Sequence, residues 1–150
     1  MIGQNDDLAT LKTLTSTLND SVNGYRDAAE HVESQEFREL FTKFADDRSR
    51  ASADLQAEVR RLGGEPDQDG STLGSLHQTW LDLKSAVTGR DDKAIINEVE
   101  RGEDYLKEKF ETALGSDSLS GESRAAVERV YQSVREGHDR VRDLKHGLEA

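Results

Sequence analysis

The sequence predicts an all-α protein, a bundle of four long helices arranged as two antiparallel hairpins. Three observations lead to this fold class. Apolar residues recur at steps of three and four along four segments, which is the spacing of one buried helix face. No segment alternates between apolar and polar residues as a half-buried strand does. Only one proline, a residue that interrupts helices, occurs in the sequence. The length of 150 residues fits a single domain over residues 1–150.

The first hairpin is predicted from two helices, at about 7–33 and 35–62. The Asn-Asp-Asp run at 5–7 places a cap and negative charge at the start of the first helix. Ser34 is predicted to cap the second helix, and because the turn between the two is so short, they must be antiparallel neighbours. Two glycines at 63–64 end the second helix.

A long connection separates the two hairpins. It covers residues 63–90 and contains an amphipathic stretch at about 72–87, which is predicted to form a shorter helix. A helix of 16 residues spans about 24 Å and a dozen extended residues add up to about 40 Å, so the connection can cross the whole bundle. The second helix and the third, at 91–114, should then run parallel, and the fourth, at 122–147, should return against the third. Two hairpins joined by one long crossover form the ferritin-like arrangement.

The amino-acid composition excludes several classes of functional site and partner. The chain carries 20 Lys and Arg against 31 Asp and Glu, a net charge of −11, and it has no cysteine. The absence of thiols excludes disulfides, cysteine-ligated metals and cysteine nucleophiles. Without a block of basic residues the chain is poorly suited to bind nucleic acid. Its first residues are acidic and contain no long apolar run, so we expect no membrane anchor and no signal peptide but a soluble cytoplasmic protein.

Three charged or polar residues fall on the stripes that should face the core. These are Arg48, Glu103 and His138, and Arg135 flanks the stripe of the fourth helix. A buried charge without a partner loses its hydration at a large cost in free energy. We therefore predict a buried polar network in which Arg48 pairs with Glu103, and His138 with Arg135 or Glu100 completes it.

A metal site is the alternative use of these positions. Ferritin-like di-iron sites take one Glu from each of two helices and a Glu-x-x-His pair from each of the other two, and such donors suit iron or manganese. Here Glu103 and His138 are the low-ranked candidate ligands, but Arg135 stands in the Glu place before His138, and Arg48 with Ala51 replaces the other pair. Because guanidinium groups repel metal cations, we favour a structural ion-pair cluster and predict no metal.

Several segments resemble one family. They are LNDSVNGYRDAAE, LQAEVRRLGGEP, GSTLGSLHQTWLDLKSAVTGRDDKAIINEVERGED and YQSVREGHDRVRDLK. Together they are similar to a bacterial ferritin-like four-helix-bundle family of unassigned function, and the likeness covers nearly the whole chain. The resemblance implies an architecture like that of ferritins and rubrerythrins, and it implies the fold more firmly than any activity.

The remaining motifs offer little chemistry. His77 and Trp80 lie one helical turn apart on the crossover, where we expect them to pack it against the bundle, although a contact with a small molecule or a partner stays open. No serine stands in a Gly-x-Ser-x-Gly turn, and no glycine-rich phosphate loop follows a strand, so no catalytic residue is predicted.

These observations favour a non-enzymatic soluble bundle with a structural or interaction role, for example under stress. In this reading an Arg/Glu/His network replaces a degenerate di-iron site, and no cofactor is expected. The alternative is an iron- or manganese-dependent oxidoreductase, or an iron-handling protein, with an altered site. The expected partner is a second copy of the chain, in a homodimer, or another protein.

Overall fold

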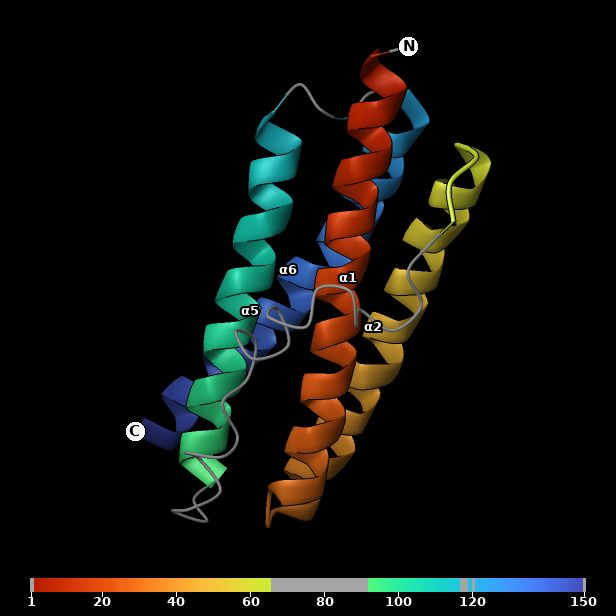
Figure 1. The fold of residues 1–150 in the computed structure, drawn as a ribbon. Coiled ribbons are helices and arrows are strands. Elements are labelled where there is room, and N and C mark those ends of the chain that lie inside the picture. The colour runs from red at the N-terminus through yellow and green to blue at the C-terminus, as the bar shows by residue number, and fades with distance from the viewer. Residues whose placement is uncertain (1, 66–91, 117–118, 120, 150) are drawn as a thin grey trace.

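The computed structural model describes residues 2–65, 92–116, 119 and 121–149. Within these residues the chain forms four helices and no strand, and the helices pack as a bundle (Figure 1). They are α1 (Ile2–His31), α2 (Gln35–Arg61), α5 (Asp92–Gly115) and α6 (Gly121–Glu149). None of the described helices combines the length and the apolar character needed to cross a bilayer. The predicted short helix at 72–87, with His77 and Trp80, lies outside the described residues.

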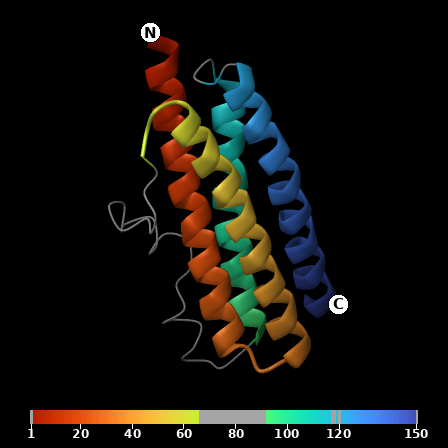
Figure 2. The same ribbon diagram turned by 90° about the vertical axis from the view of Figure 1, so that its right-hand side faces the viewer.

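Contacts at the two ends of the bundle set the direction of each helix. At one end the Asp92 carboxylate, at the start of α5, accepts hydrogen bonds from the backbone N–H groups of Glu33 at 2.8 Å and Ser34 at 3.0 Å. At the other end Ser123, near the start of α6, donates its hydroxyl proton to Glu58, near the end of α2, over 2.9 Å. The helices α2 and α5 therefore run in the same direction, and α1 and α6 run opposite to them (Figures 1 and 2).

The turn between α1 and α2 follows the predicted chemistry. Ser34 has an extended backbone and its hydroxyl oxygen accepts the backbone N–H of Phe37 at 3.3 Å, so it caps α2 as predicted. The helix ends at Arg61. Beyond it Gly63 has a φ of +87°, a left-handed conformation that glycine adopts without a steric cost.

One predicted boundary is wrong. The run at 5–7 was expected to precede the first helix, but α1 already begins at Ile2. The acidic residues of the run lie beyond the first turn of α1, which contains no acidic residue, so the run does not cap the helix. The acidic run alone therefore did not locate the helix start.

A polar layer divides the core into two apolar clusters. One cluster includes Leu11, Leu14, Leu18, Leu55, Val59, Leu106, Phe110, Val127, Val130 and Val134. The other includes Tyr25, Ala28, Val32, Phe41, Phe44, Ile95, Ile96, Val99 and Val141. On α2 the stretch between the two clusters contains Arg48, and on α5 it contains Glu103.

Helix α1 is buried on more than its apolar stripe. Thr15, Thr17 and Ser21 are buried, and each donates its hydroxyl proton to a backbone carbonyl three or four residues earlier, at 2.6 to 2.9 Å. These bonds satisfy the hydroxyl groups within the helix itself. Small polar residues can therefore lie inside this part of the protein without a partner on another helix.

Candidate functional site

The centre of the bundle holds a buried ion pair between α2 and α5. The Nη2 atom of Arg48 lies 2.8 Å from both carboxylate oxygens of Glu103. The side chain of Glu103 is fully buried and that of Arg48 is 3 % exposed. The structure thus brings together the two residues whose positions on the core stripes predicted a pair.

Tyr25 of α1 completes this centre. Its hydroxyl group donates a hydrogen bond to Oε1 of Glu103, and its ring lies under the Arg48 guanidinium, with 5.6 Å from Cζ to the ring centroid. Phe44 packs edge-on against the same ring at a centroid distance of 5.3 Å. Glu103 therefore accepts from one charged and one neutral donor, while an aromatic face covers the cation.

The pKa shifts follow from this geometry. Burial raises the pKa of Tyr25 well above its ordinary value of 10.0, and the negative charge of Glu103 raises it further. Burial is the largest single effect on the pKa of Arg48 and acts to lower it. The charge and hydrogen bond of Glu103, together with the electrostatic interactions with Tyr25 and Asp47, outweigh burial, and the net shift of this pKa is upward. Tyr25 therefore stays a neutral donor and Arg48 stays a cation, which is the combination that Glu103 needs in order to remain buried.

Helix α6 passes close to the pair at Gly137. A Cβ atom built on Gly137 would lie 2.4 Å from Nη2 of Arg48, which is inside contact distance. Only a residue without a side chain therefore fits while Arg48 points at Glu103. The role of this glycine was not predicted from the sequence, although a glycine inside a helix is a signal of close packing.

His138 and Arg135 do not join the network, and this part of the prediction is corrected. His138 Nε2 lies 2.6 Å from the Asp104 carboxylate, and Nδ1 lies 3.3 Å from that of Asp139. Arg135 is exposed. Both residues lie at the edge of the α6 stripe, where a small rotation of the helix turns a side chain from the core toward the surface. Glu100 likewise pairs elsewhere, with Lys145 Nζ at 2.8 Å.

The residues at this centre do not fit a di-iron site. The carboxylate of Glu103, at the middle of the bundle, already accepts from Arg48 and Tyr25, and the guanidinium lies beside it. Within the described part of the chain no group of three or more His, Asp or Glu side chains is placed to hold a metal ion. A di-iron site requires six such ligands around one cavity, so the donor set here suits an ion pair instead.

A small cleft between α2 and α6 lies next to the pair. It has a volume of about 130 Å³, and its lining includes Arg48 and Gly137 together with Lys43, Arg140 and Glu136. Arg48 is therefore the residue that connects the buried centre to a cavity at the surface.

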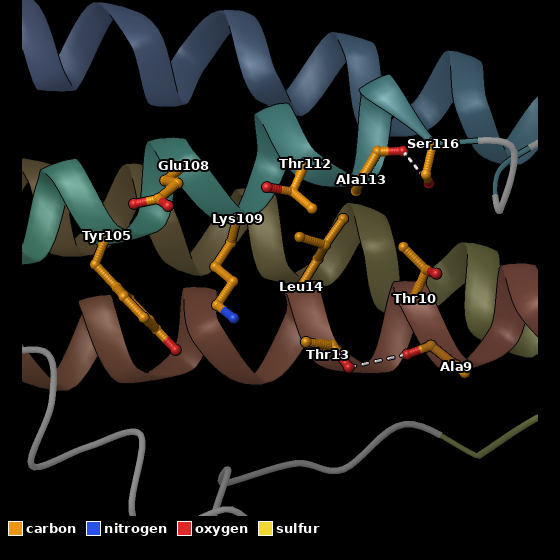
Figure 3. Close-up of a pocket in the computed structure, with 10 residues that line it drawn as sticks. All are labelled: Ala9, Thr10, Thr13, Leu14, Tyr105, Glu108, Lys109, Thr112, Ala113 and Ser116. Atoms are coloured by element: carbon orange, nitrogen blue, oxygen red, sulfur yellow. Dashed lines mark hydrogen bonds between the residues drawn. The ribbon is translucent and has the colours of Figure 1, made fainter.

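A larger groove lies between α1 and α5 (Figure 3). Its volume is about 400 Å³, and Leu14 and Ala113 contribute apolar surface to it. Two hydroxyl groups in the groove are engaged locally, because Thr13 donates to the Ala9 carbonyl at 3.1 Å and Ser116 donates to that of Ala113 at 3.0 Å (Figure 3). Neither of these two hydroxyl groups is therefore activated by a general base.

Comparison with known proteins assigns the chain to a family. No curated protein matches it. A family described as a domain of unknown function, DUF2383, matches residues 6–116, which include Tyr25, Arg48 and Glu103. Helix α6, with Gly137, follows the matched stretch. Because the match covers well over half of the 150 residues, the chain belongs to the DUF2383 family.

Proposed function

We propose that the protein is a ferritin-like bundle that works without a metal centre, as a non-enzymatic structural or interaction protein of the cytoplasm. The observation that supports this most is the 2.8 Å contact between Arg48 and Glu103 in the middle of the bundle. A cation from the protein itself stands where a ferritin-like protein would hold metal cations. The parallel course of α2 and α5 is the further support for the ferritin-like topology.

Among the described residues His138 is the one largely buried histidine, and its surroundings support a non-enzymatic role. Both ring nitrogens of His138 lie against carboxylates, those of Asp104 and Asp139, so neither nitrogen activates a serine or threonine hydroxyl group. The pair Ser123–Glu58 is equally unsuited to nucleophilic attack, because Arg61 also bonds to Glu58 at 2.6 Å and lowers the pKa of that carboxyl group. A carboxylate with a lowered pKa is a poor general base.

Elemental analysis tests this proposal. The protein is purified without chelator from cells grown with added iron and manganese, beside Glu103→Ala and His138→Ala variants. We expect far less than one metal ion per chain in the wild type and no change in either variant, since neither residue holds a metal. A matched ferritin-like iron protein, prepared in the same way, shows that the procedure retains bound metal.

The alternative function makes the opposite prediction. An iron- or manganese-binding oxidoreductase or iron-handling protein would contain at least one ion per chain, and that metal would be lost on Glu103→Ala or His138→Ala. Such a result would overturn the proposal, because it requires Glu103 to leave Arg48 and become a ligand.

A further inference from the structure

The cleft between α2 and α6 carries an unbalanced set of charges. Five charged side chains line it, three cations and two carboxylates. Two of the five are already paired elsewhere: Asp47 bonds to Arg50 at 2.8 Å, and Arg48 bonds to Glu103. The cations Lys43 and Arg140 and the carboxylate Glu136 remain, and none of these three has an ion-pair partner among the described residues.

Among the described residues, the charged lining of the cleft thus consists of Lys43, Arg140, Glu136, Asp47 and Arg48. Once the two existing pairs are set aside, the charge left is one unit positive. This local excess occurs on a chain whose net charge is −11.

The floor of the cleft offers hydrogen-bond donors. Arg48 is 2 % exposed, and its Nη1 atom is buried with no hydrogen-bond partner in the described part of the chain. Ser133 also lines the cleft. A buried guanidinium N–H without an acceptor costs free energy, and an oxygen atom of a bound group would remove that cost.

The position of Gly137 keeps the cleft open beside the guanidinium. A side chain there would collide with Arg48 Nη2, as the 2.4 Å approach of a Cβ atom shows. With glycine at this position, a volume of about 130 Å³ stays available next to Arg48, which is enough for a small ion and not for a nucleotide or a folded partner.

We propose that this cleft binds a small oxyanion of the phosphate class, held by Lys43 and Arg140 at its mouth and by donors of Arg48 and Ser133 at its floor. Oxygen acceptors suit these donors, and guanidinium and ammonium groups are the side chains that recognise phosphate. The inference goes beyond the proposed function and does not rest on it, since it concerns the cleft between α2 and α6 and the unpartnered Nη1 atom of Arg48, whereas Nη2 meets Glu103.

A substitution of Glu136 can show whether the bound ion is an anion or a cation. Its carboxylate lines the same cleft, so it repels an anion and attracts a cation. For an oxyanion site, Glu136→Gln should tighten binding. For a divalent cation site, the same change should weaken it.

The test is a titration of the full-length protein, followed by nuclear magnetic resonance of the Gly137 amide at constant ionic strength. The probes are inorganic phosphate and glycerol phosphate, which represent a free ion and a phosphomonoester, with sodium chloride as the reference salt. We expect a saturable shift with one or both phosphate probes. The ratio of their affinities then distinguishes the two sources of the oxyanion.

Variants decide whether the shift comes from this cleft. Lys43→Ala and Arg140→Ala should each weaken phosphate binding about tenfold or more, whereas Arg60→Ala, an exposed cation elsewhere on α2, should leave it unchanged. All three residues are exposed, so these variants should fold. Equal shifts with chloride, no shift with either phosphate probe, equal losses in Arg60→Ala, or stronger binding of Mn²⁺ that falls on Glu136→Gln would each overturn the proposal.

Discussion

Glu103 is the residue on which the centre of the bundle depends. Its carboxylate is fully buried, and it is tolerated there because Arg48 and Tyr25 both donate to it. Removing one member of a buried pair leaves the other charge unpaired, which costs about 3–5 kcal/mol. Replacing both members by apolar residues of similar size is often neutral or stabilising.

The comparison of a single variant with a double variant tests this at the residue scale. We expect Glu103→Ala to lower the free energy of unfolding by about 3–5 kcal/mol, and the double variant Arg48→Met with Glu103→Leu to lower it by much less. Urea unfolding measures both values. A loss below about 0.5 kcal/mol for Glu103→Ala, as for a surface residue, would contradict the buried pair.

Ionisation of Tyr25 should lower the stability of the folded protein at alkaline pH. Its pKa is raised in the folded state, so the unfolded chain loses this proton first, near pH 10.0. Below that pH the stabilisation is complete, and it is lost as the pH rises through the raised folded value. We expect the free energy of unfolding to fall above about pH 10, and to fall less steeply in Tyr25→Phe, by urea unfolding at a series of pH values. If the unfolding free energies of the wild type and Tyr25→Phe fell equally steeply with pH, the pKa of Tyr25 would not be raised by folding.

Part of this centre could be predicted from the sequence. Arg48 and Glu103 carry opposite charges and both lie on apolar stripes, where a lone charge needs a partner. The role of Tyr25 could not be predicted, because periodicity places its ring in the core and says nothing about which group meets its hydroxyl. His138 was misplaced because a residue at the stripe edge belongs to the core or the surface according to the rotation of α6.

At the scale of the helices, Gly137 lets α6 pack closely against the side chain of Arg48. Helix propensity alone predicts that Gly137→Ala stabilises α6 by about 1 kcal/mol. The 2.4 Å approach to Nη2 predicts the reverse, because Arg48 is held in place by Glu103 and cannot move aside freely. We expect a net loss of about 1–3 kcal/mol in urea unfolding, as for an overpacked core.

The matched control for Gly137 lies in the same helix. Gly147 is exposed and a Cβ atom there meets nothing within 4 Å, so Gly147→Ala should be neutral or slightly stabilising. If both alanine variants were stabilising, Arg48 would not occupy the space beside Gly137.

Asp92 joins the two hairpins at one end. Its carboxylate accepts the backbone N–H groups of Glu33 and Ser34 in the turn between α1 and α2. We expect Asp92→Ala to lower the unfolding free energy by about 1–2 kcal/mol, because both bonds are lost at a partly exposed site. Asp46→Ala, an exposed carboxylate on α2, is the control and should change it by about 0.5 kcal/mol or less. Equal effects of the two substitutions would contradict the role of Asp92 in the turn.

The end of a helix could be predicted where a residue at that end favours a capping conformation. Ser34 and Gly63 act through their own backbone conformation, and both ends of α2 were predicted to within one residue. The start of α1 was not, since its acidic run is compatible with several helix starts.

At the scale of the whole molecule, the polar centre separates two apolar clusters along four helices. The bundle could be predicted because the stripes of all four helices are continuous and because the connection was long enough to make α2 and α5 parallel. The cleft beside Arg48 could not, since a cavity depends on how closely two helices approach, and sequence periodicity does not fix that distance.

Anomalous X-ray diffraction tests the central claim most directly. Crystals soaked in manganese are measured near the absorption edge of that metal. We predict no anomalous peak between the four helices and density that joins Arg48 Nη2 to the Glu103 carboxylate at about 2.8 Å. One or two strong peaks coordinated by Glu103, with Arg48 turned away, would contradict it.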